Sequence, residues 1–243
     1  QGDWSKRGYG GNWDNVISGH DDYPGFGDGA LVKVAIGYTE LRGDTTPATA
    51  YIDDITINGD LYELELPPPT EVYVDAAWTS QGDVDAFDPD LIWQHDAFAS
   101  IQAGINAVAE DGTVNVAAGT YNEAVLIDRQ LTLLGANDGV NPVTEPRGAE
   151  SIIDASVIKA SGVVFDGFTV TSDSGPGIYT GKTILGDQIE NLQVRNNVVQ
   201  VHILGIVVGN TRLATVSNNL IQNAYVGIYL HMAHDSEISG NEV

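Results

Sequence analysis

The sequence contains no cysteine, which excludes disulfide bonds and thiolate metal ligands. Basic residues are scarce: 10 Lys and Arg stand against 34 Asp and Glu, for a formal net charge of −24. A field of that sign repels phosphate backbones and acidic lipids, so we expect no nucleic-acid partner. No apolar run is long enough to span a bilayer, and we therefore expect no membrane insertion. These absences favour a secreted protein, extracellular or at the cell surface.

The first part of the chain, residues 1–66, is rich in Gly, Asp and aromatic residues and contains two β-like runs, 30–37 and 50–57. The text TAYIDDITING at 49–59 resembles the closing strands of carbohydrate-binding β-sandwich (jelly-roll) modules. We therefore predict a partial β-sandwich over 1–66 that begins inside a longer module. Residues 67–71, which start with three prolines, form a Pro-rich linker.

Residues 72–243 are predicted to form one all-β domain. Val72–Asp75 reads as a first strand, and an acidic loop covers residues 76–95. We expect Asp96 to cap a helix, because the apolar residues that follow it recur at helical spacing. These residues are Phe98, Ile101, Ile105 and Val108. Asp111-Gly112 is expected to end the helix.

The text DAFASIQAGINAVAEDGTVNVAAGTYNEAV, followed by LTLLGA, resembles the opening of pectin-lyase-like right-handed parallel β-helix proteins. The resemblance covers about residues 96–243. It implies a right-handed parallel β-helix whose N-terminal end is capped by an amphipathic α-helix.

An internal repeat supports the same fold without reference to any family. Asn197, Asn219 and Asn241 are spaced by 22 residues (219 − 197 and 241 − 219). An apolar residue, Val194, Val216 or Ile238, lies three positions before each Asn, which predicts one internal column in stacked parallel coils. Phe165–Phe168 is aligned with Arg195–Val198 as an earlier coil. The last coil has no cap, so we expect the native β-helix to continue beyond Val243.

The regular asparagines are interpreted as structural. A buried Asn at a tight turn can donate to neighbouring coils, and a stacked column satisfies each amide with the next one. The acidic residues suggest a metal instead. Closely spaced carboxylates suit calcium, a hard cation that prefers oxygen ligands. We predict calcium ligands at Asp54, Asp83, Asp85, Asp88 and Asp90, with a solvated acidic loop as the alternative.

Aromatic residues among the glycines of the first segment predict carbohydrate binding, because sugars stack their apolar faces on exposed rings. The candidates are Trp4, Trp13 and Tyr23, with packing in the core of the module as the alternative. We predict no catalytic residues. His231, His234 and Asp235 could supply an acid and a base, but a turn expected near Ala233 favours a structural role.

Two functional hypotheses remain open. In the first, the chain is a non-catalytic surface, matrix or filament module that binds glycans, calcium or copies of itself. In the second, it is the N-terminal portion of a secreted polysaccharide lyase, epimerase or hydrolase. The β-helix fold alone does not choose between them. The acidic charge and the lack of a catalytic motif favour the first.

Overall fold

The structure, a computed structural model of the chain, describes residues 54–57, 60–63, 66–181 and 188–243. Contacts between residues divide the chain into two compact units, Gln1–Leu66 and Pro67–Val243. In the first unit, strands β1 (Asp54–Ile57) and β2 (Asp60–Glu63) form an antiparallel pair. The remainder of the predicted sandwich lies outside the described residues and stays a prediction.

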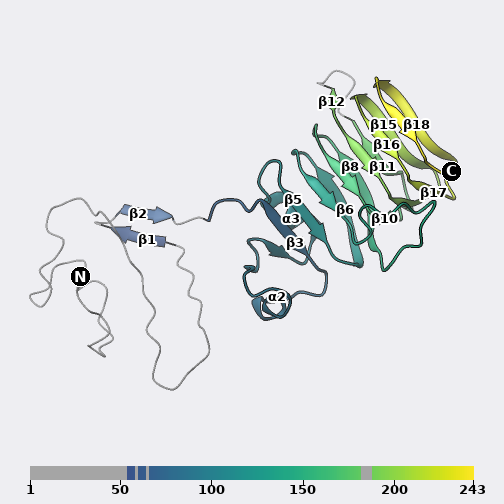
Figure 1. Cartoon of the computed structure of the whole chain (residues 1–243). Coiled ribbons are helices and arrows are strands. Elements are labelled where there is room, and N and C mark those ends of the chain that lie inside the picture. Colours follow the sequence, from purple (N-terminus) through teal and green to yellow (C-terminus); the bar gives the residue numbers. More distant parts are fainter. Residues whose placement is uncertain (1–53, 58–59, 64–65, 182–187) are drawn as a thin grey trace, which may run out of the picture. The chain divides into compact units, whose positions relative to one another are not determined.

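The second unit is a right-handed parallel β-helix, as the sequence predicts (Figure 1). It contains two short helices, α2 (Gln81–Phe87) and α3 (Ile101–Ala107). Its strands are, in chain order, β3 (Glu71–Val74), β4 (Ala97–Phe98), β5 (Thr113–Val116), β6 (Gly119–Ile127), β7 (Thr132–Leu134), β8 (Ser151–Ile158), β9 (Val164–Asp166), β10 (Phe168–Val170), β11 (Pro176–Thr180), β12 (Ile189–Glu190), β13 (Gln193–Arg195), β14 (Val198–Gln200), β15 (Leu204–Arg212), β16 (Thr215–Ser217), β17 (Leu220–Gln222), β18 (Val226–His234) and β19 (Glu237–Ser239).

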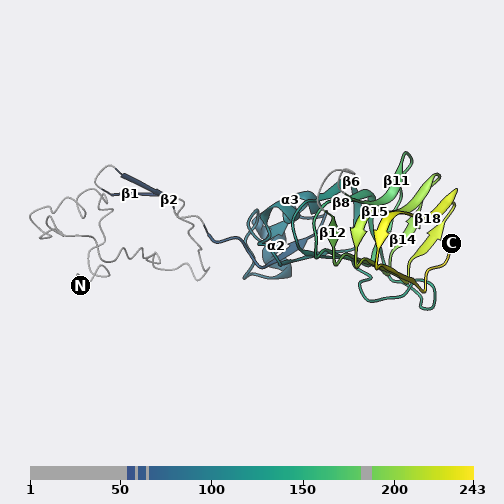
Figure 2. The ribbon, with the colours of Figure 1, turned by 90° about the horizontal axis from the view of Figure 1, so that it is seen from above.

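These strands form two parallel sheets, and from β5 onward the chain passes repeatedly from one sheet to the other. The eight-stranded sheet has the order β19-β16-β13-β9-β7-β5-β3-β4. The nine-stranded sheet has the order β12-β15-β11-β8-β10-β14-β17, with β18 beside β15 and β6 beside β8. Figure 2 shows the coils stacked in chain order, from α3 at one end to β18 at the other. The later coils repeat every 22 residues, because β13, β14 and β15 pair with β16, β17 and β18.

One internal column takes an apolar side chain from each coil of the eight-stranded sheet. The strand registers align Val72, Val114, Leu133, Phe165, Val194, Val216 and Ile238. The first six of these side chains are fully buried. The predicted alignment of the last three is confirmed. Burial of such a column removes apolar surface from water at every coil, which is the main driving force for folding.

The predicted alignment of the earlier coil is wrong by one residue. Phe165 pairs with Val194, and Asp166 pairs with Arg195. Because successive strand residues point to opposite faces, this single step decides which side chain enters the core. Phe165 is fully buried and stacks on Phe168, with ring centroids 4.7 Å apart.

The predicted asparagine ladder is present at Asn197, Asn219 and Asn241. The Asn197 side-chain amide donates to Oδ1 of Asn219 at 3.0 Å, and the Asn219 amide donates to Oδ1 of Asn241 at 2.9 Å. The backbone N–H groups of Asn197 and Asn219 donate to the same two oxygens. Asn197 and Asn219 are fully buried, so the ladder satisfies polar groups that water cannot reach.

The backbone N–H of Phe168 donates to Oδ1 of Asn197, so Phe168 occupies the equivalent position one coil earlier. The residue before each of these four positions has a left-handed backbone conformation. The φ angles are +83° at Gly167, +55° at Asn196, +55° at Asn218 and +64° at Gly240. Glycine and asparagine adopt this conformation more readily than other residues, which explains their recurrence at this turn.

Helix α3 has the predicted buried face but begins later than expected. Its N-cap is Ser100, whose hydroxyl oxygen accepts from the backbone N–H of Ala103 at 3.3 Å. Asp96, the predicted cap, instead accepts from the N–H of Ile92 at 2.6 Å. Phe98 lies in β4, outside the helix. The four apolar residues predicted for this face are all buried.

Candidate functional site

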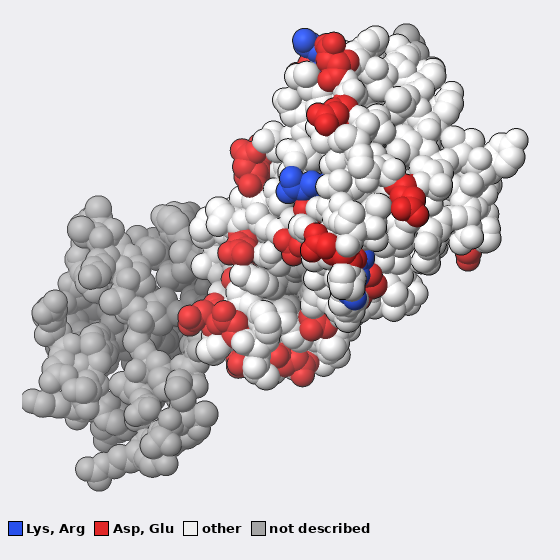
Figure 3. Space-filling view, turned by 45° about the vertical axis from the view of Figure 1, so that its right-hand side comes forward, with Lys and Arg blue, Asp and Glu red and all other residues white. Residues whose placement is uncertain are grey.

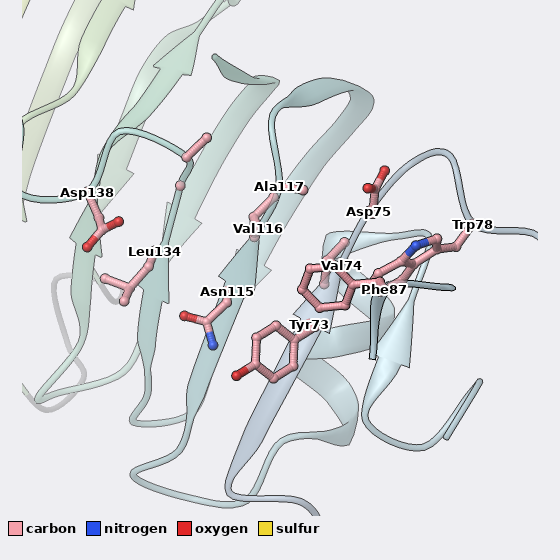
Figure 4. Close-up of a pocket in the computed structure, with 12 residues that line it drawn as sticks. Tyr73, Val74, Asp75, Trp78, Phe87, Asn115, Val116, Ala117, Leu134 and Asp138 are labelled. Atoms are coloured by element: carbon pink, nitrogen blue, oxygen red, sulfur yellow. The ribbon is translucent and has the colours of Figure 1, made fainter. Parts of the chain in front are cut away.

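A cleft of about 280 Å³ lies on the outer face of the eight-stranded sheet, over its first coils (Figure 4). Strand register places Tyr73 beside Asn115 and Asn115 beside Leu134, so these residues line the cleft along the sheet. We call it the aromatic cleft. The side chains used in the argument below are Tyr73, Asp75, Trp78, Phe87, Asn115 and Asp138.

Three aromatic rings meet at one end of the aromatic cleft. The Phe87 ring lies 5.5 Å from Trp78 and 5.9 Å from Tyr73 between centroids. Trp78 is buried in a small apolar cluster with Val84 and Ala97, whereas Phe87 is 62% exposed. Trp78 therefore packs against Phe87 from the buried side, and the Phe87 ring is accessible to solvent or to a ligand.

Helix α2 positions Phe87 at its last residue, and Asp83 fixes the start of this helix. The Asp83 carboxylate accepts from the backbone N–H and the hydroxyl of Thr79, both at 2.8 Å, and from the Ser80 hydroxyl at 3.0 Å. These bonds to Thr79 and Ser80 lower the pKa of Asp83, because they stabilise its charged form. The Gln81 side chain ties the helix to the next loop through the Leu91 carbonyl, at 2.8 Å.

Polar groups surround the apolar part of the aromatic cleft. Asn115 Nδ2 donates to Oε1 of Glu71 at 3.0 Å. The pKa of Tyr73 is raised above its usual value. The largest cause is a hydrogen bond with Glu71, and burial and the negative charges of Glu71 and Asp88 contribute less. Asp75 accepts from the N–H of Ala77 at 2.8 Å, and its carboxylate has further acceptor capacity. A ring to stack on and nearby donors and acceptors together suit a small polar ligand with one apolar face.

The sequence does not predict the aromatic cleft, because residues 76–95 are expected to form a loop and not a helix. A signal for α2 was present, since Ser80 and Asp83 have the Ser-x-x-Asp spacing of a capping box. The meeting of Tyr73, Trp78 and Phe87 could not be derived from that spacing, because it depends on how α2 folds back on β3.

The candidate sugar-binding residues Trp4, Trp13 and Tyr23 lie outside the described residues, so their role stays a prediction. Asp54 lies in β1, where only the backbone is described.

The histidine cluster lies on a strand rather than at a turn. β18 continues through Ala233 to His234, so the turn predicted there is wrong. The strand bends at Met232, whose φ is +56°. His231 and His234 are exposed. Asp235 forms an exposed ion pair with Arg212 at 3.4 Å.

Asp235 also occupies a recurring turn position. Asn191, Leu213 and Asp235 follow one another at steps of 22 residues, with φ angles of +56°, +55° and +50°. The same backbone conformation thus recurs with three different side chains, which fits the structural role proposed for this position.

Comparison with known proteins adds one similarity. Residues 143–243 match the family described as "Periplasmic copper-binding protein (NosD)". No curated protein and no solved structure matches the chain. The match supports the coarser part of the predicted resemblance, the right-handed parallel β-helix, because the matched family has this fold and is described as periplasmic. The finer resemblance to pectin-lyase-like proteins and to a jelly-roll module stays a prediction. Within the described residues, no helix has the length and apolar character needed to cross a membrane.

The prediction of bound calcium is wrong. The name of the matching family refers to copper and not to calcium. In the described part of the chain, no three or more His, Asp or Glu side chains form a group that could hold a metal ion. The carboxylates of the acidic loop have local partners instead. Asp85 accepts from Gln81 at 2.6 Å, Asp88 accepts from the N–H of Asp90 at 3.0 Å, and Asp83 accepts from the Ser80 hydroxyl at 3.0 Å.

Among the residues that the structure describes, no cluster of His, Asp or Glu side chains fits a copper centre either. Copper sites in proteins use cysteine, methionine and histidine ligands. The chain has no cysteine and one methionine. The described histidines, His95, His202, His231 and His234, join no metal-binding group among the residues that the structure describes.

Proposed function

We propose that this chain is a non-catalytic, extracytoplasmic β-helix module that binds glycans at the aromatic cleft. The observation that carries the proposal is the exposed Phe87 ring, supported by Trp78 and bordered by Tyr73, Asp75 and Asn115. The apolar face of a pyranose ring stacks on an exposed aromatic ring, and its hydroxyls need donors and acceptors beside that ring. The volume of about 280 Å³ is suited to a short part of a glycan chain.

Two further observations support a scaffold with a binding role. The asparagines of the ladder form hydrogen bonds along the axis of the β-helix and hold the coils together. The match to a family described as periplasmic supports a location outside the cytoplasm. In this proposal the β-helix is a stiff support that presents the cleft.

The test is a binding screen of the full chain against soluble oligosaccharides, followed by titration calorimetry on the sugars that bind. We expect Phe87→Ala to weaken binding about tenfold, which corresponds to about 1.4 kcal/mol. Tyr225→Ala is the matched control, because Tyr225 is 89% exposed and does not line the cleft. A reducing-end assay on the bound sugars should detect no cleavage. Equal losses in both variants, or no glycan binding at all, would refute the proposal.

A further inference from the structure

The first coils of the β-helix carry an unbalanced negative charge. Between residues 67 and 138 the single basic side chain is Arg129. The acidic residues in the same range are Glu71, Asp75, Asp83, Asp85, Asp88, Asp90, Asp96, Glu110, Asp111, Glu123, Asp128 and Asp138. Figure 3 shows acidic side chains gathered on the lower part of the described surface, whereas a large area above them carries few charges. The aromatic cleft is part of the acidic end of the β-helix.

No cation of these coils compensates the carboxylates of the cleft. Asp75 and Asp138 line it, and neither forms an ion pair among the described residues. Arg129 is committed elsewhere, since its guanidinium donates to the carbonyls of Asn106 at 3.2 Å and Val108 at 3.1 Å. The charges of Glu71 and Asp88 also reach the cleft, because both act on the Tyr73 phenol at its rim.

A ligand for this cleft must combine an apolar face with positive charge. The face of an aromatic ring attracts cations through its quadrupole, and carboxylates beside it add a direct Coulomb attraction. Uronic-acid glycans have the apolar face, but their carboxylates would be repelled. Neutral sugars would stack on Phe87 and could hydrogen bond to Asp75 or Asp138, but they would gain no charge attraction from these carboxylates.

We propose that the aromatic cleft prefers glycans that carry free amines, such as oligomers of glucosamine, over neutral and acidic glycans. The sugar ring stacks on Phe87, and its ammonium group lies against Asp75 or Asp138. This inference rests on the proposed glycan-binding function. It adds that the cleft selects glycans by their positive charge.

The experiment compares three soluble probes of equal length on the full chain: oligomers of glucosamine, the same oligomers fully N-acetylated, and oligogalacturonate. N-acetylation removes the positive charge and keeps the ring. We expect the free-amine oligomer to bind at least tenfold more tightly than the N-acetylated one at low salt. The difference should shrink as NaCl is added, because salt screens exposed charges. Oligogalacturonate should bind most weakly.

The double variant Asp75→Asn/Asp138→Asn should remove most of this preference and leave binding of the N-acetylated oligomer within about twofold. Asparagine keeps the acceptor that the Ala77 N–H uses, so the loop at Asp75 is preserved. Asp90→Asn is the matched control, because it removes one charge from the same acidic end without lining the cleft. It should keep the tenfold preference.

The outcomes separate the two proposals. If the N-acetylated oligomer binds as tightly as the free amine, the amine preference is refuted and glycan binding stands. If none of the three probes binds, the amine preference is refuted, whereas glycan binding is refuted only if the wider oligosaccharide screen also finds no ligand. Oligolysine of equal charge is the last probe. If it binds as tightly as oligoglucosamine and loses as much affinity in Phe87→Ala, the cleft selects cations in general, and the assignment to amino sugars is overturned.

Discussion

At the scale of single residues, several buried polar side chains form hydrogen bonds that connect successive coils. Arg147, whose side chain is 7% exposed, pairs with Glu150 at 2.7 Å and donates to the carbonyl oxygens of Gly167 at 3.0 Å and Asn196 at 2.5 Å. Asp166 accepts from Arg195 and from the Asn196 amide, both at 2.8 Å. Each of these side chains therefore joins neighbouring coils, and these charged groups contribute to the stacking of the coils.

The asparagine ladder gives a prediction at this scale. Asn219→Ala leaves the buried backbone N–H of Asn197 without its acceptor and removes the side-chain hydrogen bonds to the Asn197 amide and to the carbonyls of Val194 and Ser217. Each buried group without a partner costs roughly 1–3 kcal/mol, so we expect the free energy of unfolding to fall by about 3 kcal/mol or more. Urea denaturation measures this loss. Gln222→Ala, an exposed change in the same coil, should stay within about 0.5 kcal/mol of the parent. Equal effects of the two changes would show that the ladder is not a stabilising feature.

At the scale of elements, what the sequence predicts depends on how local each feature is. The 22-residue step predicts the internal column and the ladder, because stacked coils convert a sequence period directly into contacts. Phe165 was misaligned by one position, since the earlier coils have longer loops and lack the ladder asparagine there. Helix α2 was missed because it has seven residues and one buried apolar side chain, Val84, and so has no helical period to detect. The aromatic cleft was missed with it.

Tyr121 joins β6 to the first coils and gives a prediction of pH dependence. Its hydroxyl donates to the carbonyl of Ala117 at 2.9 Å, and burial raises the pKa of Tyr121 to about 12 from the model-compound value of 10.0. The folded state holds this proton more tightly than the unfolded state does. Its contribution is therefore complete below pH 10 and is lost as the pH rises through 12. The loss is at most about 2.7 kcal/mol, since one pKa unit corresponds to about 1.36 kcal/mol.

The measurement is urea unfolding of the parent and of Tyr121→Phe between pH 9 and pH 12. The variant loses the hydrogen bond to Ala117 and is less stable at pH 9. Its stability should nevertheless fall less steeply above pH 10, because the titrating group is gone. Parallel curves for the two proteins would mean that Tyr121 ionises in the folded state as easily as in the unfolded chain.

At the scale of the whole molecule, charge and hydrophobic burial are organised along the axis of the β-helix. The apolar column runs through the eight-stranded sheet from β3 to β19, whereas the acidic residues are concentrated in the coils up to residue 138. Composition predicted the net charge of −24 but not this distribution across the surface, which requires the coil boundaries. The same limit explains the calcium error: carboxylates close in sequence were assumed to converge, but α2 and its hydrogen bonds direct them to separate local partners.

The concentration of like charges leads to the last prediction, which concerns the response of stability to salt. Carboxylates that repel one another at one end of the β-helix lower its stability at low ionic strength, and added salt screens them over about 10 Å at 0.1 M. We expect the melting temperature to rise by a few degrees between 10 mM and 500 mM NaCl, since about 1 kcal/mol shifts it by about 2–4 °C in a domain of this size. The double variant Asp85→Asn/Asp90→Asn, made away from the aromatic cleft, should melt higher than the parent at 10 mM NaCl and gain less from added salt. Differential scanning calorimetry of both proteins measures this. An identical salt response would mean that these carboxylates are already screened by solvent and do not repel one another measurably.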